Sequence, residues 1–186
     1  MSTPEAVRLS SLRVLTAVVE DHPGVLSRVS GMIRRRGFNI QGLSVGPTGV
    51  PGRSRMTLTV DARHAEVDQV EKQLDRLIEV LEIEDLTEVP HISSELALVK
   101  LEASGASRAA ALAVIEEQGA RVVDERPEQL IVELSGDFEQ VESTLEALQP
   151  FRVLDLARSG PVAISKRIAI GEQPSSWRSP AGGIAP

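Results

Sequence analysis

The 186-residue sequence contains no cysteine and no tyrosine, and its aromatic residues are three phenylalanines and one tryptophan. Without cysteine there are no disulfides, thiolate nucleophiles or cysteine–zinc sites, which fits a reducing cytoplasm. So few aromatics exclude a stacking platform for single-stranded nucleic acid. No apolar run approaches the roughly 20 residues that span a bilayer, and the first residues show no secretory signal. We therefore expect a cytoplasmic protein that binds neither membrane nor nucleic acid.

A net positive charge is also lacking, since the formal net charge is −7. Binding to a phosphate backbone needs a broad basic surface, so this negative net charge argues against nucleic acid as a partner. The arginine run at 34–36 is typical of a solvated last helical turn that complements the helix dipole. The three histidines fall at no metal-ligand spacing, and we expect no metal site; they are His22, His64 and His91.

The first half of the chain predicts the order βαββαβ. Residues 12–20 are apolar and β-branched and indicate a buried strand. A helix follows, which Asp21 can cap; Pro23 suits its first turn and Gly37 is the stop. A strand with a bulge at Gly42 and an alternating strand at 54–61 come next. The unit ends with a strand at 82–89, preceded by a helix whose apolar stripe contains Val67, Val70, Leu74, Leu77, Ile78 and Leu81.

The same order returns after a predicted join at 89–94. The elements are a strand from 95, a helix stopped at Gly119, two strands around a turn near Pro127, a helix capped by Asp137 and a closing strand. This order is typical of a four-stranded antiparallel sheet with two helices on one face. The fold class is therefore α+β, with two ferredoxin-like modules at 11–89 and 95–167. The remainder, 168–186, is rich in Pro, Gly and Ser and is expected to be disordered.

Catalysis by this chain is not expected, because no catalytic set can be assembled from its residues. There is no glycine-rich phosphate cradle and no Ser-His-Asp or Cys-His combination. The many carboxylates between 66 and 88 fall on the polar face of the predicted helix rather than as a catalytic pair. Exposed aromatics, which an RNA-binding module of this topology needs on its central strands, are missing.

The turn before the first helix is the best candidate for a small-molecule site. Backbone N–H groups at a helix start attract a carboxylate, and Gly24 lets a ligand approach closely. Asn39, after the helix stop, offers a donor and an acceptor to a zwitterion, and we expect the topology to bring it near Gly24. In the alternative reading Gly24 only helps the turn and Asn39 only bonds local backbone. The residues by themselves leave both readings open.

Residues 20–47, EDHPGVLSRVSGMIRRRGFNIQGLSVGP, followed by SRMTLTV, resemble the ACT domain of the regulatory small subunit of acetolactate synthase. The resemblance continues through SELALVKLEASG and LDLARSGPVAISK and covers about residues 11–167. It implies a branched-chain amino acid ligand, usually valine, bound between two ACT domains. The matching positions are Asp21, Gly24, Val25, Leu26, Asn39 and Ile40.

The same resemblance implies a non-catalytic role. Such a subunit docks on a catalytic large subunit, raises its activity and makes it sensitive to inhibition by the end product. Thiamine diphosphate, magnesium and FAD then belong to the large subunit, and no cofactor to this chain. Two copies are expected to pair edge to edge through their ACT domains. The alternative is a free-standing ACT-type amino-acid sensor that regulates another protein.

Asp21 departs from the family pattern, because several members have asparagine at this position. A carboxylate that faces the carboxylate of the ligand would repel it. Asp21 is therefore expected either to cap the helix or to meet the ammonium group of the ligand.

Overall fold

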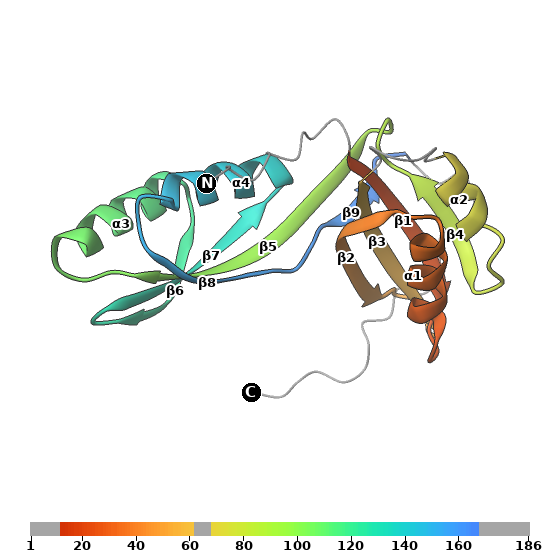
Figure 1. Ribbon diagram of the computed structural model, residues 1–186, viewed down its shortest axis with the longest axis horizontal. Coiled ribbons are helices and arrows are strands. Elements are labelled where there is room, and N and C mark those ends of the chain that lie inside the picture. The colour runs from red at the N-terminus through yellow and green to blue at the C-terminus, as the bar shows by residue number, and fades with distance from the viewer. Residues whose placement is uncertain (1–11, 62–67, 168–186) are drawn as a thin grey trace. The chain divides into compact units, whose positions relative to one another are not determined.

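The computed structural model describes residues 12–61 and 68–167 (Figure 1). The chain divides into two compact units, one of which is Ser93–Val162. The other contains the described residues up to Ile92 and those from Ala163 onward. The predicted tail at 168–186 and the predicted helical position of Val67 lie outside the described residues.

The first unit contains the predicted four-stranded antiparallel sheet with two helices. Its sheet has the order β2-β3-β1-β4, and its core is formed by apolar side chains of the sheet and the helices, among them Leu15, Ile33, Met56, Leu58 and Leu74. The predicted bulge is confirmed by a register shift between Ile40 and Gly42, and Gly37 has a φ of 77° after the helix. The elements are β1 (Leu12–Glu20), α1 (Val25–Arg35), β2 (Asn39–Pro47), β3 (Arg53–Asp61), α2 (Asp68–Leu74) and β4 (Val80–Asp85).

The second helix of this unit is shorter than its apolar stripe predicts. Helix α2 ends at Leu74, and β4 begins at Val80, which pairs with Val19 of β1. The predicted helical positions of Leu77, Ile78 and Leu81 are therefore wrong, and the side chain of Ile78 is exposed. The edge strand β4 hydrogen-bonds to the buried strand β1. The free energy gained by this pairing outweighs the weak helix propensity of the residues around it, so the helix ends early.

The second unit repeats this topology, and its sheet has the order β6-β7-β5-β8. As predicted, the carboxylate of Asp137 caps α4 by accepting from the amide of Gln140 at 2.9 Å. Gly119 follows α3 with a φ of 66°. The elements are β5 (His91–Glu102), α3 (Gly105–Glu117), β6 (Arg121–Arg126), β7 (Gln129–Gly136), α4 (Phe138–Leu148) and β8 (Val153–Arg158). The predicted α+β class with two ferredoxin-like modules is thus confirmed.

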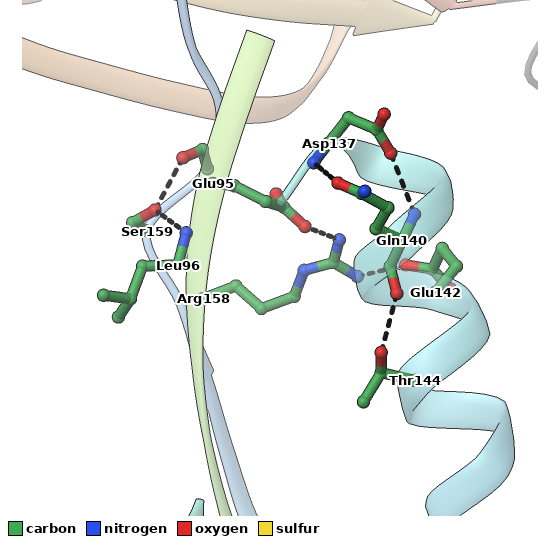
Figure 2. A network of polar contacts seen from close by, with 9 residues as sticks. Glu95, Leu96, Asp137, Gln140, Glu142, Thr144, Arg158 and Ser159 are labelled. Atoms are coloured by element: carbon green, nitrogen blue, oxygen red, sulfur yellow. Dashed lines mark hydrogen bonds and ion pairs between the residues drawn. The ribbon is translucent and has the colours of Figure 1, made fainter. Parts of the chain in front are cut away.

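A buried carboxylate joins three elements of the second unit. Figure 2 shows Arg158 of β8 between Glu95 of β5 and Glu142 of α4, with an ion pair to each. The Glu95 side chain is only 5% exposed. The guanidinium of Arg158 also lies 5.5 Å from the ring centroid of Phe138, at the start of α4. The arginine therefore ties the edge strand to the helix and neutralises a carboxylate that water does not reach.

The last described strand, β9 (Val162–Ser165), pairs with β5. From Ala163 onward the described chain belongs to the first unit. The amide of buried Ala163 donates to Oγ1 of Thr57 in β3 at 3.3 Å, and Oγ of Ser165 donates to Glu84 in β4 at 3.2 Å. Sequence reasoning did not predict this strand, because four residues carry too little periodicity. Among helices within 12–61 and 68–167, none combines the length and apolar character needed to cross a membrane.

Candidate functional site

The turn between β1 and α1 leaves the start of the helix without a side-chain cap. Gly24 is the N-cap residue, with a φ of 99°, and no side chain accepts a hydrogen bond there. This contrasts with α4, whose first turn is closed by Asp137. A Cβ added to Gly24 would meet no atom within 4 Å, so the backbone angle is what calls for glycine here. The amide of Val25 donates to the carbonyl of His22 at 3.5 Å, so the amides of Leu26 and Ser27 are the ones available to a carboxylate.

Asp21 does not cap the helix, so that predicted role is wrong. Its amide donates to the carbonyl of Gly52 at 2.9 Å, which holds the turn against the loop before β3. Its side chain is exposed and makes no hydrogen bond or ion pair within the described parts of the chain. Asp21 precedes the N-cap Gly24 by three positions, because the helix begins later than its sequence signals indicate. The carboxylate is left free beside the helix start.

The two apolar candidates of the turn have different surroundings. Val25 is 4% exposed and belongs to the core, so its side chain is not available to a ligand and only its backbone faces the turn. Leu26 is 46% exposed. Of the two, Leu26 is the side chain that can contact a molecule outside this unit.

Charged groups surround the turn, and sequence reasoning missed two of them. His22 contacts Glu20 at 3.0 Å from its Nε2 atom, and its Nδ1 atom lies 3.2 Å from the carbonyl oxygen of Pro23. Glu79 is buried and forms an ion pair with Arg28 of α1. Glu79 had been expected on the polar face of a longer helix, and for His22 the sequence predicted only that it binds no metal. No local signal in the sequence marks either contact.

Asn39 and Ile40 lie at the other end of the sheet from Gly24. Asn39 pairs with Asp61 of β3, and Asp61 pairs with Leu12 at the start of β1. Glu20 lies eight residue steps along β1 from Leu12, a span of about 26 Å at 3.3 Å per residue. The expectation that one chain brings Gly24 and Asn39 together is therefore wrong. Asn39 is exposed, whereas Ile40 packs against the core.

The two edges of the first sheet differ in charge. Strand β2, at one edge, has the sequence NIQGLSVGP and carries no ionisable side chain over nine residues. Strand β4, at the opposite edge, carries Glu82, Glu84 and Asp85. Charged edges resist pairing with other strands, whereas a long uncharged edge invites it. The β2 edge is thus the one that is open to pairing with a further strand.

Metal chemistry finds no support in the side chains of this site. Within the described residues there is no group of three or more histidine, aspartate or glutamate side chains that could hold a metal ion. What the turn offers is a set of backbone amides, a free carboxylate and a histidine. This set matches a small zwitterion rather than a reacting phosphate or a carbonyl group.

The fold and the turn define a protein of two ferredoxin-like modules, the first of the ACT type. Residues 15–82 match the family described as AHAS small subunit-like ACT domain, and residues 94–167 match the family described as small subunit of acetolactate synthase. Together the two matches cover both modules. The chain belongs to the family of acetolactate synthase small subunits.

Individual relatives agree with this family assignment. The acetolactate synthase small subunit of Mycobacterium bovis is 41% identical over 152 residues, which is 82% of this chain and 90% of the relative. The small subunit of Aquifex aeolicus is 40% identical over 161 residues, 86% of this chain and 84% of the relative. The crystal structure of the small subunit from Thermotoga maritima has a TM-score of 0.74 at 29% identity, covering 84% of this chain and 98% of that one.

Proposed function

We propose that this chain raises the activity of the acetolactate synthase large subunit and makes it sensitive to valine. The observation that carries the proposal is the uncapped helix start at Gly24, in a module that matches the ACT domain of this family. Helix-start amides bind the ligand carboxylate, and the free carboxylate of Asp21 meets the ammonium group. Valine influences the complex only by binding one of its states more tightly than another.

The proposed site is completed by a second copy of the chain. Two β2 edges that pair antiparallel about a two-fold axis near Leu43 set Asn39 of one copy opposite Pro47 of the other. Pro47 pairs with Ser54, and Ser54 pairs with Val19, next to the end of β1. Asn39 of the second copy therefore lies at the same end of the sheet as the β1–α1 turn of the first copy. Within a single chain, Asn39 and this turn lie at opposite ends of the sheet. A two-fold axis produces two equivalent sites.

Leu26 is the proposed contact for the branched side chain of the ligand. Arg28 faces the β4 side of the unit, because it pairs with Glu79 just before that strand. Leu26 precedes Arg28 by two residues, which is about 200° around a helix. Leu26 therefore lies on the flank of α1 toward the β2 edge. A pocket of this kind separates ligands that differ by one methylene by only about 1–3 kcal/mol, so leucine and isoleucine compete with valine.

The remaining parts of the proposal follow from the family. The large subunit carries the thiamine diphosphate, the magnesium and the FAD, and this chain supplies no catalytic group. We place the assembled enzyme in the cytoplasm.

Reconstitution tests the proposal. The purified chain is mixed with an acetolactate synthase large subunit, and pyruvate condensation is measured with and without valine. We expect a rise in activity that valine reverses. In the Gly24→Asp variant we expect the valine response to be lost, because a new side chain at positive φ distorts the turn and its carboxylate repels the ligand.

The matched control is Gly119→Asp, which places the same residue at another exposed glycine of positive φ with open space around it. This variant should keep the valine response. Valine at 100 times its dissociation constant should also stabilise the chain by about 2.7 kcal/mol in thermal melting. No activation and no valine response would refute the proposal, whereas a valine shift without activation would favour a free-standing amino-acid sensor.

A further inference from the structure

Both ring nitrogens of His22 face acceptors. Nε2 lies 3.0 Å from Oε2 of Glu20, and Nδ1 lies 3.2 Å from the carbonyl oxygen of Pro23. A neutral imidazole has one N–H group and can donate to only one of the two, whereas the imidazolium donates to both. The geometry therefore favours the protonated ring. In agreement, the hydrogen bond to the Pro23 carbonyl and that to Glu20 raise the pKa of His22 above its ordinary value.

The charge of His22 matters because the other charges around the turn are mostly negative. Glu20 and Asp21 flank the ring along the chain, and buried Glu79 approaches from the segment before β4. Two cations accompany them. Arg28 of α1 is paired with Glu79, and Arg53 of β3 lies opposite Glu20 in the sheet. When His22 loses its proton, three carboxylates face two guanidinium groups. When the ring is protonated, the charges balance.

We propose that protonated His22 supplies the positive charge that lets this turn accept the carboxylate of an amino acid, so that ligand binding is linked to pH. The inference rests on the amino-acid site proposed above and specifies how that site is regulated. His22 neighbours the uncapped start of α1 and bonds to the carbonyl of Pro23, next to Gly24. A unit charge beside the helix start acts on the same carboxylate that the helix amides bind.

The direction of the effect follows from linkage. The bound carboxylate favours the imidazolium, so the pKa of His22 rises further on binding and a fraction of one proton is taken up. The affinity is then highest below the raised pKa of His22 and falls as the pH rises through it. Valine remains a zwitterion in this range, so the ligand does not add a titration of its own.

Calorimetric titration of the full-length chain with valine tests the inference. The measurement covers about pH 6 to about pH 8 at constant ionic strength, in buffers of different ionisation enthalpy. For the unmodified chain we expect the affinity to fall about three- to tenfold across this range, with proton uptake on binding. The His22→Gln variant should bind weakly without a pH dependence. The His22→Lys variant keeps the charge throughout and should bind tightly without a pH dependence.

The control is His91→Gln, which removes a histidine whose ring bonds to the carbonyl of Val89 instead. It should behave like the unmodified chain. Valine binding that is independent of pH in the unmodified chain, or that keeps its pH dependence in His22→Gln, would overturn the role of His22 and leave the binding site standing. Absence of valine binding at every pH, in a chain shown to be folded by circular dichroism, would overturn the site and this inference together.

Discussion

Replacing Arg158 with leucine is expected to destabilise the second unit by about 3–5 kcal/mol, because the change leaves Glu95 buried without its cation. The Glu95 side chain is 5% exposed, and the ion pair with Arg158 is its compensation in the network of Figure 2. A loss of this size in a unit of this length lowers its melting temperature by at least about 10 °C. Thermal unfolding followed by circular dichroism measures the shift.

The double variant Glu95→Leu, Arg158→Leu should recover most of this loss, since a buried ion pair replaced by apolar groups is often neutral. The interaction energy from the double-mutant cycle then measures the coupling between the buried carboxylate of Glu95 and the guanidinium of Arg158. The control is Arg152→Leu, which removes the partner of Glu102 in a pair whose side chains are 75% and 44% exposed. It should cost less than about 1 kcal/mol. Equal, small losses for Arg158→Leu and Arg152→Leu would show that water solvates Glu95.

Placing lysines at positions 41 and 45 of β2 is expected to dissociate the proposed dimer. With the two-fold axis near Leu43, residue 41 of one copy lies opposite residue 45 of the other, so Gln41→Lys with Val45→Lys sets like charges against each other twice. Lysine on an edge strand is also a device by which proteins prevent pairing. We expect the dimer affinity to fall by about ten- to a hundredfold, measured by sedimentation velocity.

The control carries its two lysines on the opposite edge, as Leu81→Lys with Glu82→Lys. Both residues are exposed in β4, and this variant should remain as dimeric as the unmodified chain. Because Asn39 of the second copy completes the proposed site, the β2 variant should also lose its stabilisation by valine. A β2 variant that stays dimeric would rule out pairing through this edge. A monomer that still responds fully to valine would show that one chain holds the whole site.

Features set by short stretches of chain could be predicted from the sequence. Gly37 and Gly119 end their helices and Asp137 caps α4 because each of these effects depends on residues within one turn. The bulge near Gly42 was visible as a break in the alternation of one strand. The two βαββαβ units followed from hydrophobic periodicity, which reports whether a face is buried without reference to its partner.

The candidate site was predictable only in part. Gly24 stood out because a glycine after a strand and before a helix marks a turn at which backbone groups are exposed. The capping role of Asp21 was predicted wrongly, because the start of α1 is decided by a left-handed residue at 24 and by the bond of the Asp21 amide to Gly52, from a distant loop. The contacts of His22 and the burial of Glu79 depend on side-chain positions that no spacing specifies.

The register and order of the strands decided which distant residues meet, and the sequence could not predict these contacts. Asn39 follows Gly24 by only fifteen positions, yet the crossover through α1 places it at the opposite end of the sheet. The early end of α2 and the return of β9 to Thr57 likewise depend on pairing and packing between segments far apart in the chain. Apart from β9 and the end of α2, the sequence by itself determined the elements, their order and the glycine of the turn, because these arise from neighbouring residues. The tertiary structure decided which charges meet at that turn and which residues stay apart, because those contacts join residues that are distant along the chain.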